Sequence, residues 1–501
     1  MHVFHTRPVI QLEDIITQMK GQEAKTEGQM GGTAGEVAVV MVPLPAQGNL
    51  NLLLHLSRLI ASHDVPVYYT GAATHIRQAQ HRLQGWSPHS VSTLHFHAFP
   101  TPSFDSPDPD PTLRSPAHLL PSFRAALLLR EPLREFLMDL SRTARRVVVI
   151  YDFWMAWNVQ DVPSVPNTES YTFRSTSALS TLSFNWEMMK KEKLSPLPPE
   201  VSQVLKHLPD LDSSSSSTQE LSELDKLQLE APQFNSGTIF NTCEVLEGTF
   251  LDLLATDDRL MGPMQWAIGP FNPIILQCAA VAAAESSRHP CLSWLDQQEK
   301  NSVIFVSFGS TITLPQEQIN EIAVGLEKSG HKFIWAAREA DKGDIFAGEE
   351  KRVALPDGYE EEIKGKGMAV RDWVPQLEIL AHPSTGGFLS HCGWNSCVEA
   401  ISMGVPIAAW PVHSDQPRNA ALITEVLKVG FEVDGGGCGG RGVVRSGRIR
   451  EAVLRLMGCT EGDEMRRRAE ELSRAVKLSV LDRGGASRKE MDSFLSHITR
   501  E

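Results

Sequence analysis

"GMAVRDWVPQLEILAHPSTGGFLSHCGWNSCVEAISMGVPIAAW" spans residues 367–410 and alternates three short apolar runs with two helical patterns. The apolar runs, at 367–373, 386–391 and 406–410, are typical of buried strands. Pro375 begins the first helical pattern and Gly404 closes the second, as expected at helix ends. Because strands that alternate with helices pair in parallel, the stretch predicts a βαβαβ unit.

The same alternation continues on both sides of this unit. Upstream of it, "SVIFVSFGS" (302–310) and "KFIWAAR" (332–338) flank another helical pattern. Near the start of the chain, "VAVVMVPL" (37–44), "VPVYYTG" (65–71) and "RRVVVIYD" (145–152) are strands of the same type. A chain of 501 residues is too long for one ordinary core, so we expect two parallel α/β lobes.

Pro270 and Pro273 mark the predicted linker between the lobes. We therefore expect an N-terminal lobe at 30–270 and a C-terminal lobe at 271–480. The final segment, 481–501, contains a helical pattern that follows a glycine turn.

Three segments carry no strand or helix prediction. Residues 1–29 are polar and patternless, and we expect a disordered extension. The serine-rich stretch 208–226 predicts a mobile loop inserted in the first lobe. "GGGCGG" (435–440) formally matches a dinucleotide-binding fingerprint. However, an Arg-rich helix follows it and no acidic residue closes the unit, so a surface loop is the better interpretation.

Composition narrows the function. The chain has 47 Lys and Arg residues against 61 Asp and Glu residues, a formal net charge of −14. No run of basic residues offers the phosphate-neutralising surface that nucleic-acid binding needs. The apolar runs fall short of the ~20 residues of a spanning helix, and no signal segment opens the chain. Seven cysteines lack zinc-site spacing, which predicts reduced thiols and no metal site. We expect a soluble, cytoplasmic, monomeric protein with small-molecule partners, no nucleic acid and no membrane.

Groups that suit a diphosphate follow the second strand of the 367–410 unit, at the sheet edge where α/β proteins bind ligands. Asn395 and Ser396 open a helix, whose N–H groups and positive dipole end favour a phosphate. His391, just before that helix, adds another donor.

Groups that suit the rest of a nucleotide sugar lie nearby. Glu399, one turn into the same helix, offers its carboxylate to a ribose diol. Trp373 offers a flat face to a nucleobase. Asp415 and Gln416 follow the third strand, where they are placed to bind the hydroxyls of a sugar. The sequence therefore predicts a nucleotide-sugar site.

Each of these residues taken alone has a purely structural alternative. Ser396 and Glu399 have the spacing of a capping box that satisfies backbone N–H groups. Trp373 and Trp394 are equally suited to a core, and His391 to a buried structural imidazole. Their convergence on one sheet edge favours the binding site.

The run from Trp373 to Gln416 resembles the plant secondary-product glycosyltransferase signature over its whole length, and residues 36–501 resemble the plant UDP-dependent glycosyltransferase family. Shorter strings, including "PAQGNLNLLLHLSRLI" (45–60) and "READKGDIFAG" (338–348), resemble zeatin O-glucosyltransferases. The resemblance implies the GT-B fold, with two Rossmann-like lobes facing across a cleft and the last helix crossing back to the N-terminal lobe. It implies UDP in the C-terminal lobe, the acceptor in the N-terminal lobe, and no metal or other cofactor.

The resemblance also implies a role for each residue of the signature. For UDP, Trp373 stacks on uracil, Val374 bonds it through the backbone, Gln376 lies beside the nucleoside and Glu399 holds the ribose. The diphosphate is held by His391, Asn395 and Ser396, with Ser307 or Ser310. The sugar is held by Trp394, Asp415 and Gln416, and Gln416 resembles the residue found in glucose-using members.

One position departs from the family. The family has "PAQGHLN" where this chain has "PAQGNLN" (45–51), and its His is the general base, oriented by an Asp that corresponds to Asp152. We expect Asn49 in the loop after the first strand, facing the cleft, with Asp152 in reach. An amide does not take a proton at neutral pH. His55 is a poor substitute, because six positions rotate it about 240° around a helix.

The resulting prediction is an inverting, UDP-glucose-dependent O-glucosyltransferase whose acceptor is a hydroxylated small molecule, first of all a zeatin-type cytokinin. Asn49 leaves three alternatives: a slow enzyme relying on Asp152 or solvent, a UDP-sugar or cytokinin binder, or an enzyme whose acceptor needs little deprotonation. A flavonoid or other phenolic is the alternative acceptor. Candidate walls of the acceptor pocket are "SFNWEMM" (183–189) and "HFHAF" (95–99), with core packing as the alternative for both.

Overall fold

The computed structural model describes residues 36–83, 86, 91–113, 115–188, 197–208, 219–231, 235–256, 264–275, 288–348, 352–433 and 442–501. The predicted extension 1–29, the serine run 209–218 and the glycine-rich loop 435–440 lie outside these residues.

The N-terminal lobe is built on a parallel sheet with the strand order β3-β2-β1-β4-β5-β6-β7. Val39 of β1 pairs with Val67 of β2 on one side and with Val148 of β4 on the other. The central strands are buried on both faces, which is why their sequences are continuous apolar runs. The strands are β1 (Val37–Val42), β2 (Val67–Ala72), β3 (Leu94–Phe99), β4 (Arg146–Asp152), β5 (Thr168–Arg174), β6 (Thr238–Phe240) and β7 (Gln265–Ala267).

The C-terminal lobe repeats this design with the order β10-β9-β8-β11-β12-β13, again all parallel. In each lobe the third, second, first and fourth strands lie next to one another in that order. The strand order therefore reverses beside the first strand, and α/β sheets bind ligands at such a switch point, outside the carboxyl ends of the strands. The two-lobe prediction is confirmed. The strands are β8 (Val303–Ser307), β9 (Lys332–Ala336), β10 (Gly367–Val370), β11 (Thr385–Ser390), β12 (Ile407–Ala409) and β13 (Gly430–Glu432).

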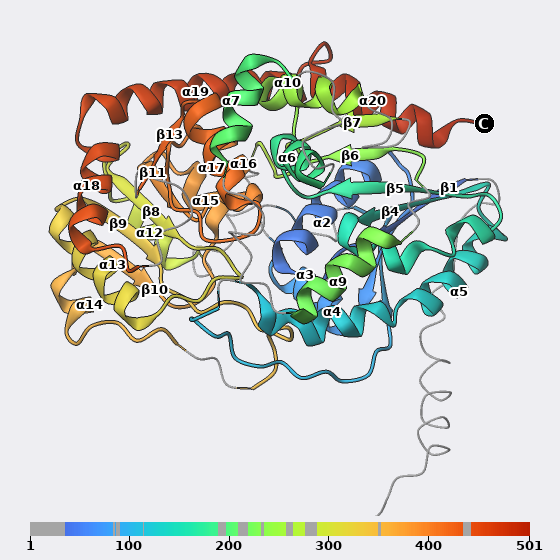
Figure 1. Cartoon of the computed structure of the whole chain (residues 1–501), viewed down its shortest axis with the longest axis horizontal. Helices are drawn as coiled ribbons and strands as arrows, with labels where there is room; N and C mark the ends of the chain where they lie inside the picture. Colours follow the sequence, from blue (N-terminus) through green and yellow to red (C-terminus); the bar gives the residue numbers. More distant parts are fainter. Residues whose placement is uncertain are drawn as a thin grey trace, which may run out of the picture.

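Helices cover both faces of each sheet (Figure 1). In the N-terminal half they are α2 (Gln47–Ala61), α3 (Ala73–His81), η2 (Ala117–Leu119), α4 (Leu120–Leu127), α5 (Arg130–Ser141), η3 (Phe153–Val159), η4 (Val162–Ser164), α6 (Ala178–Met188), α7 (Pro199–His207), α9 (Gln219–Glu230) and α10 (Glu244–Ala255). In the C-terminal half they are α12 (Pro290–Leu295), α13 (Gln316–Ser329), α14 (Tyr359–Glu362), α15 (Gln376–Ala381), α16 (Trp394–Met403), α17 (Gln416–Ala421), η7 (Leu422–Val426), α18 (Ser446–Met457), α19 (Thr460–Leu481) and α20 (Ala486–Thr499).

Helix α9 corrects one prediction. The stretch 208–226 was expected to be a loop, but the chain is helical from Gln219 onward. The physical reason is local, because Leu221, Leu224 and Leu227 recur every third residue after the serine run and give one side of a helix an apolar stripe.

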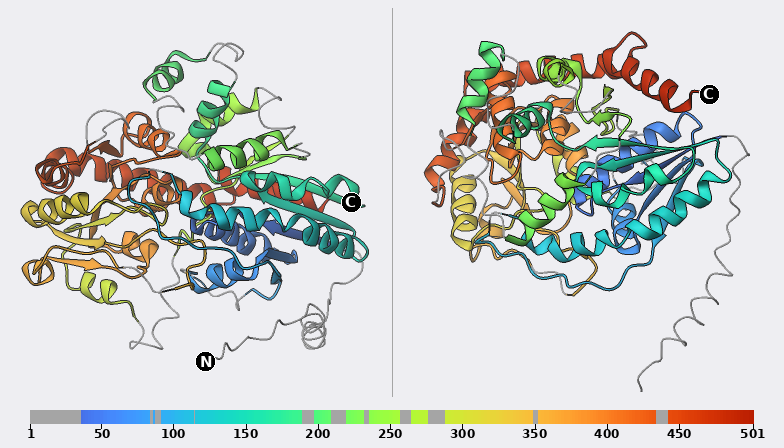
Figure 2. Two further views of the ribbon diagram at one scale, coloured as in Figure 1. Left: turned by 60° about the horizontal axis from the view of Figure 1, so that its bottom comes forward. Right: turned by 45° about the vertical axis from the view of Figure 1, so that its right-hand side comes forward.

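The two lobes lie side by side, and the views in Figures 1 and 2 agree on this arrangement. They are not independent cores. One hydrophobic cluster joins Leu179 and Leu182 of α6 and Phe250 of α10 to Phe388 and Ile401 of the C-terminal lobe. This continuous packing fixes the distance between the carboxyl edges of the two sheets, where the predicted site residues lie.

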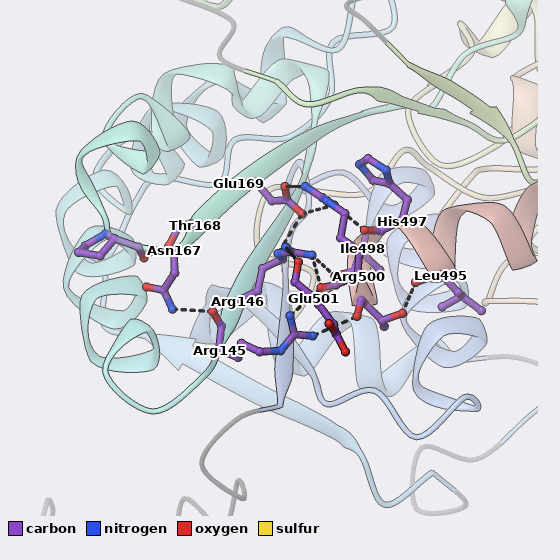
Figure 3. Close-up of polar contacts among 12 residues, drawn as sticks. Arg145, Arg146, Asn167, Thr168, Glu169, Leu495, His497, Ile498, Arg500 and Glu501 are labelled. Atoms are coloured by element: carbon purple, nitrogen blue, oxygen red, sulfur yellow. Dashed lines mark hydrogen bonds and ion pairs between the residues drawn. The ribbon is translucent and has the colours of Figure 1, made fainter.

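Helix α20 crosses back from the C-terminal lobe and packs on the N-terminal lobe, as predicted (Figure 1). Its end is held by an arginine pair from the start of β4 (Figure 3). Arg145 donates to the carbonyl oxygens of Thr499 and Arg500 at 3.0 and 2.6 Å, and Arg146 donates to that of Ile498 at 3.2 Å. Cationic donors at a helix C-terminus satisfy its last carbonyl groups and oppose its dipole.

Candidate active site between the two lobes

A cavity of about 780 Å³ lies between the carboxyl edges of the two sheets. It has the size of a small-molecule site, and both lobes line it. Of the residues that the sequence predicted for catalysis and donor binding, the cavity lining contains Asn49, Ser307, Ser310, Trp373, Val374, Gln376, His391, Trp394, Asn395, Ser396, Glu399, Asp415 and Gln416. The fold thus brings the predicted residues together, although they span most of the chain.

The N-terminus of α16 forms one wall of the cavity. Helix α16 begins at Trp394, so Asn395 and Ser396 lie in its first turn, as predicted. Asn395 Nδ2 donates to the carbonyl oxygen of Gly48 in the other lobe at 2.9 Å. A Cβ at residue 48 would lie 3.0 Å from Asn395 Nδ2, a tight contact that glycine avoids. The N-terminus of α16 thus lies against the first turn of α2 at the cavity.

His391 stands at the end of β11 between two glycines. A Cβ on Gly309 or on Gly393 would lie 2.5 Å from His391 Nε2, and Gly309 also has φ = +77°. Only glycine gives the ring this space at both positions. Burial, together with the smaller effect of nearby His413, lowers the pKa of His391 to about 3. The imidazole is therefore neutral and able to donate one hydrogen bond to an anionic ligand.

Gln376, Ser396 and Glu399 form one hydrogen-bonded group. Gln376 Nε2 donates to Ser396 Oγ at 2.9 Å and to Glu399 Oε2 at 2.7 Å. The N-cap of α16 is Gly393, without a side-chain cap, so the capping-box alternative is wrong. Burial raises the pKa of Glu399 to about 7. A buried carboxylate with a single amide partner has acceptor capacity left for a hydroxyl-bearing ligand.

Trp373 lines the cavity, with two guanidinium groups close to its ring. Arg338, which follows β9, lies with Cζ 5.1 Å from the indole centroid. Arg82, from the end of α3 in the other lobe, lies with Cζ 4.4 Å from the same centroid. Trp373 thus faces the cavity and is not a core aromatic.

The residues predicted for the sugar are held differently from one another. Gln416 Oε1 accepts from the backbone N–H groups of Val412 and His413 at 2.9 and 3.0 Å, which leaves its amide donors for a ligand. Asp415 is half-buried and accepts from Asn419 Nδ2 at 2.9 Å. Trp394 has a further, structural role, because its Nε1 donates to the carbonyl oxygen of Asn241 in the other lobe at 2.8 Å. Its one donor is used there, so it offers a sugar only the surface of its ring.

Asn49 occupies the predicted base position, with one correction. It lies in the first turn of α2, which begins at Gln47, and not in a loop. Its Nδ2 donates to Asp152 Oδ2 at 2.7 Å and to Ser175 Oγ at 3.0 Å. With the amide nitrogen held by a carboxylate, the amide oxygen is the atom left for the cavity.

Asp152 does not reach the cavity. It is fully buried behind Asn49, and its Oδ1 accepts from the backbone N–H of Trp154 at 3.0 Å. Burial raises the pKa of Asp152 above its usual value, although the hydrogen bond from Asn49 partly offsets this. Both oxygens have partners inside the lobe, which disfavours Asp152 as a direct base.

His55 is excluded as a substitute base. It is buried, and it accepts from Trp86 Nε1 at 3.2 Å. Burial, together with the smaller effect of the Arg58 charge, lowers its pKa to about 3. Its ring points into the N-terminal lobe, as its rotation around α2 predicted.

The acceptor end of the cavity contains residues that the sequence analysis missed. Its walls are largely apolar, with Phe123 and Leu127 of α4, Trp154 and Phe184 among them. Helix α9 contributes Asp225, the one acidic side chain of the described N-terminal lobe that lines the cavity. Burial raises the pKa of Asp225 to about 6. The available signal was the leucine repeat of α9, which was overlooked within the polar insertion.

The two segments predicted as walls of the acceptor pocket, 183–189 and 95–99, differ in whether they line the cavity. In 183–189, Phe184 and Asn185 line the cavity, and their contact with an acceptor stays a prediction; residue 189 lies outside the described residues. In 95–99 no residue lines it, because β3 is the edge strand of its sheet. His97 instead stacks on Phe136 of α5, with 4.1 Å between ring centroids. That wall is therefore core packing.

Among the described residues, no group of three or more His, Cys, Asp or Glu side chains is arranged to hold a metal ion. In the same part of the chain, no helix combines the length and apolar character needed to cross a membrane.

Comparisons with known proteins agree with this geometry. The family described as "Glycosyltransferase, N-terminal domain" matches residues 35–273, and the family described as "UDP-glucoronosyl and UDP-glucosyl transferase" matches residues 232–432. The chain is 50% identical to a zeatin O-glucosyltransferase of Phaseolus lunatus, over 93% of this chain and 97% of the relative. It is 47% identical to a zeatin O-xylosyltransferase of Phaseolus vulgaris, over 93% and 98%.

Solved structures show the same fold. UGT73P12 of Glycyrrhiza uralensis, complexed with glycyrrhetinic acid 3-O-monoglucuronide, superposes with a TM-score of 0.72 at 26% identity, covering 92% of this chain and 96% of that chain. UGT2 of Phytolacca americana, complexed with UDP-2fluoro-glucose and pterostilbene, gives 0.70 at 26% identity, covering 93% and 100%.

Proposed function

The chain belongs to the UDP-glucoronosyl and UDP-glucosyl transferase family, and from this premise we propose that it transfers glucose from UDP-glucose to the hydroxyl group of a zeatin-type cytokinin, with inversion at the anomeric carbon. One observation carries the proposal. A single cavity brings the nucleotide-directed residues of the C-terminal lobe opposite the Asn49–Asp152 pair and an apolar pocket in the N-terminal lobe. The acceptor class rests on relatives that are 50% and 47% identical and are both named for zeatin.

The C-terminal lobe would hold the donor. Trp373 would stack on uracil, Glu399 would accept from the ribose hydroxyls, and the α16 N-terminus with His391 would bind the diphosphate. Negative charge develops on the diphosphate as the bond to the sugar breaks. Preformed N–H donors at a helix end stabilise such charge without reorganising. For this reason we propose that transfer needs no metal ion.

The reaction would be a single displacement. The acceptor oxygen attacks the anomeric carbon from the face opposite UDP, the carbon–oxygen bond to the diphosphate breaks, and UDP leaves with that electron pair. The acceptor hydroxyl must lose its proton in the same process. Asn49 Oδ1 is placed to accept a hydrogen bond from that hydroxyl and so to orient it. The proton itself must pass to solvent, because a neutral amide does not take it.

Asn49 is also the observation that favours a second candidate function. A site with intact binding groups and no proton acceptor describes a UDP-sugar or cytokinin binder with little turnover. The structure supports donor binding equally in both cases, so only turnover separates them.

The donor sugar and the acceptor each have a competing candidate. Gln416 resembles the residue of glucose users, yet one relative is named as a xylosyltransferase, so UDP-xylose is the competing donor. A planar purine suits the aromatic wall of Phe123, Trp154 and Phe184, and a flavonoid is the competing acceptor. We also propose that the enzyme acts as a monomer in the cytoplasm, which suits its free thiols, among them the buried Cys243, Cys392 and Cys397.

The test is product formation. Purified protein is incubated with trans- or cis-zeatin, a flavonol or a simple phenol, together with UDP-glucose or UDP-xylose, with and without a chelator. We expect a zeatin glucoside by mass spectrometry, with no effect of the chelator. UDP binding by calorimetry without any glycoside would support the binder, and a flavonol glucoside alone would overturn the cytokinin assignment. A requirement for added metal would overturn the metal-free mechanism.

A further inference from the structure

The nucleobase platform receives a contact from the lobe that is not expected to bind the donor. Arg82 follows α3 in the N-terminal lobe, and its Cζ lies 4.4 Å from the centroid of the Trp373 indole. Trp373 lines the cavity, whereas Arg82 is not one of the described residues that do. Arg82 therefore approaches the ring from outside the cavity, and a stacked base would use the part of the indole that faces the cavity.

Arg82 is held rigidly in this place. Its side chain and that of Asp341 are 9% and 6% exposed, and the two form an ion pair across the lobes. Asp341 forms a second ion pair with Arg338. Burial raises the pKa of Asp341, but the charges of Arg338 and Arg82 outweigh this and lower it, so the carboxylate stays ionised between them. A buried guanidinium paired in this way keeps its plane and position.

The same guanidinium also touches the helix that carries the base position. Arg82 Nη1 donates to Gln47 Oε1 at 3.2 Å, and Gln78 Nε2 donates to the same oxygen at 2.9 Å. Gln47 is the first residue of α2, two residues before Asn49. One side chain thus joins the nucleobase platform of one lobe to the catalytic helix of the other.

We propose that Arg82 is a positioning residue for the nucleobase: it backs the Trp373 indole, so that the base-stacking platform is completed by the N-terminal lobe. This inference rests on the proposed function, because it presumes a UDP-type donor at Trp373. A guanidinium against an indole face attracts the ring and holds it in one orientation. A ring that is already ordered loses less conformational freedom when a base stacks on it.

The chain offers a matched control. Arg77 lies on the same helix α3, and its Cζ is 3.5 Å from the ring centroid of Phe346. Phe346 belongs to the segment that follows Arg338 and Asp341, so Arg77 supports the same contact between the lobes without touching Trp373. Comparing Arg82→Met with Arg77→Met therefore separates support of the platform from docking of the lobes.

The experiment measures the affinity of each variant for UDP and for inorganic pyrophosphate by calorimetry. Pyrophosphate presents the charged part of UDP without the base. We expect Arg82→Met to weaken UDP binding about two- to twelve-fold, the cost of ordering one side chain on binding, and to leave pyrophosphate binding unchanged. Arg77→Met should leave both affinities unchanged. In turnover assays, KM for UDP-glucose should rise in Arg82→Met while KM for the acceptor stays the same.

A further variant keeps the proposal testable if Arg82→Met fails to fold. Arg82→Lys keeps a cation for Asp341 but lacks the planar group, so it should fold and still lose UDP affinity. Equal losses for UDP and pyrophosphate, or full UDP affinity in a folded Arg82 variant, would overturn the inference. If wild-type protein does not bind UDP, the proposed function itself is overturned. This measurement on wild type does not depend on any Arg82 variant.

Discussion

At the scale of single residues, the site differs from its family at an atom that matters for proton transfer. Asn49 keeps the place and the partner expected for the base, because its Nδ2 donates to Asp152 at 2.7 Å. An imidazole in this place would donate to Asp152 in the same way and still have a basic nitrogen for the acceptor. Asparagine preserves the first property and removes the second.

Asn49→His should therefore raise kcat on an aliphatic hydroxyl with little change in affinity for UDP-glucose. A positioned proton acceptor contributes about 10²- to 10⁴-fold, or roughly 3 to 5.5 kcal/mol of barrier. Steady-state kinetics with zeatin measures the gain, which should be smaller on an acidic phenol because it ionises more readily.

Asp152→Asn in the Asn49→His background is the control. The histidine would lose the carboxylate that orients it, so most of the gain should disappear. Wild-type protein that already turns over zeatin as fast as Asn49→His would show that another group takes the proton.

Glu399 makes donor binding depend on pH. Burial raises its pKa to about 7, and only the ionised form offers all its oxygen lone pairs to the ribose. Affinity for UDP-glucose should therefore be full above pH 7 and fall as the pH drops through 7, by up to about tenfold per unit. His391, whose pKa is about 3, adds no change in this range.

Calorimetry between pH 8 and pH 6 measures this effect. Glu399→Gln should bind more weakly than wild type at pH 8, approach it at pH 6 and show no such slope. If wild type and Glu399→Gln have parallel pH profiles, Glu399 does not control the dependence.

At the scale of elements, the strongly patterned parts of the chain were predictable and the polar insertion was not. Apolar runs such as 147–150 became the central strands, because a strand buried on both faces allows few other sequences. The gathering of Trp373, His391 and Glu399 at one cavity was predictable as well, since they follow strand ends at one edge of the sheet. Helix α9 was not, because its pattern is short and its burial depends on the rest of the lobe.

Strand β3 also shows the limit of prediction from local sequence. Its alternation of histidine and phenylalanine suits an aromatic pocket as well as a core, and only the strand order decides between them. Because β3 lies at the edge of the sheet, His97 and Phe99 pack on Phe136 of α5 and Phe96 packs on Tyr69 of β2. Non-local pairing fixed this outcome, and local sequence does not encode it.

Helix α9 should control the choice of acceptor through Asp225. An adenine ring presents N–H donors, which a carboxylate accepts. The pKa of Asp225 is raised to about 6 by burial, so this contact is present above pH 6 and lost as the pH falls through 6. KM for zeatin should rise between pH 7 and pH 5, and Asp225→Asn should raise it at pH 7 and remove the slope.

Two controls accompany this measurement. Glu230→Gln changes an exposed carboxylate of the same helix, in an ion pair with Lys226, and should behave as wild type. A phenol without an N–H group should show no slope. Equal slopes for zeatin and the phenol would assign the titration to another group.

At the scale of the whole molecule, the two lobes and the last helix form one structure. Asn419 of α17 illustrates this, because its Oδ1 accepts from Ser177 Oγ in the N-terminal half at 2.8 Å while its Nδ2 donates to Asp415 at 2.9 Å. The sugar-directed carboxylate is thus oriented by a residue that both lobes hold. Such contacts favour a fixed cleft, in which a donor and an acceptor meet in a set geometry.

Phe494→Ala tests how far α20 is part of the N-terminal core. Phe494 is fully buried, with its ring centroid 5.2 Å from that of Trp266 and 5.6 Å from that of Tyr171. Removing a buried aromatic ring leaves a cavity and costs about 3 to 5 kcal/mol. Urea unfolding should show this loss in the free energy of unfolding. Leu478→Ala, on the neighbouring α19, removes a side chain that is 64% exposed and should change stability by less than about 0.5 kcal/mol.

The same variant also separates stability from catalysis. No described residue of α20 lines the cavity, so Phe494→Ala should keep its affinity for UDP at a temperature where it is folded. A cost below about 1 kcal/mol would mean that α20 lies on the lobe without completing its core. Full stability combined with lost UDP binding would mean that the helix acts on the cleft and not on the core. The expected result, lower stability with unchanged affinity, follows from where Phe494 is buried, because the helix that crosses back closes the N-terminal core on the side away from the site.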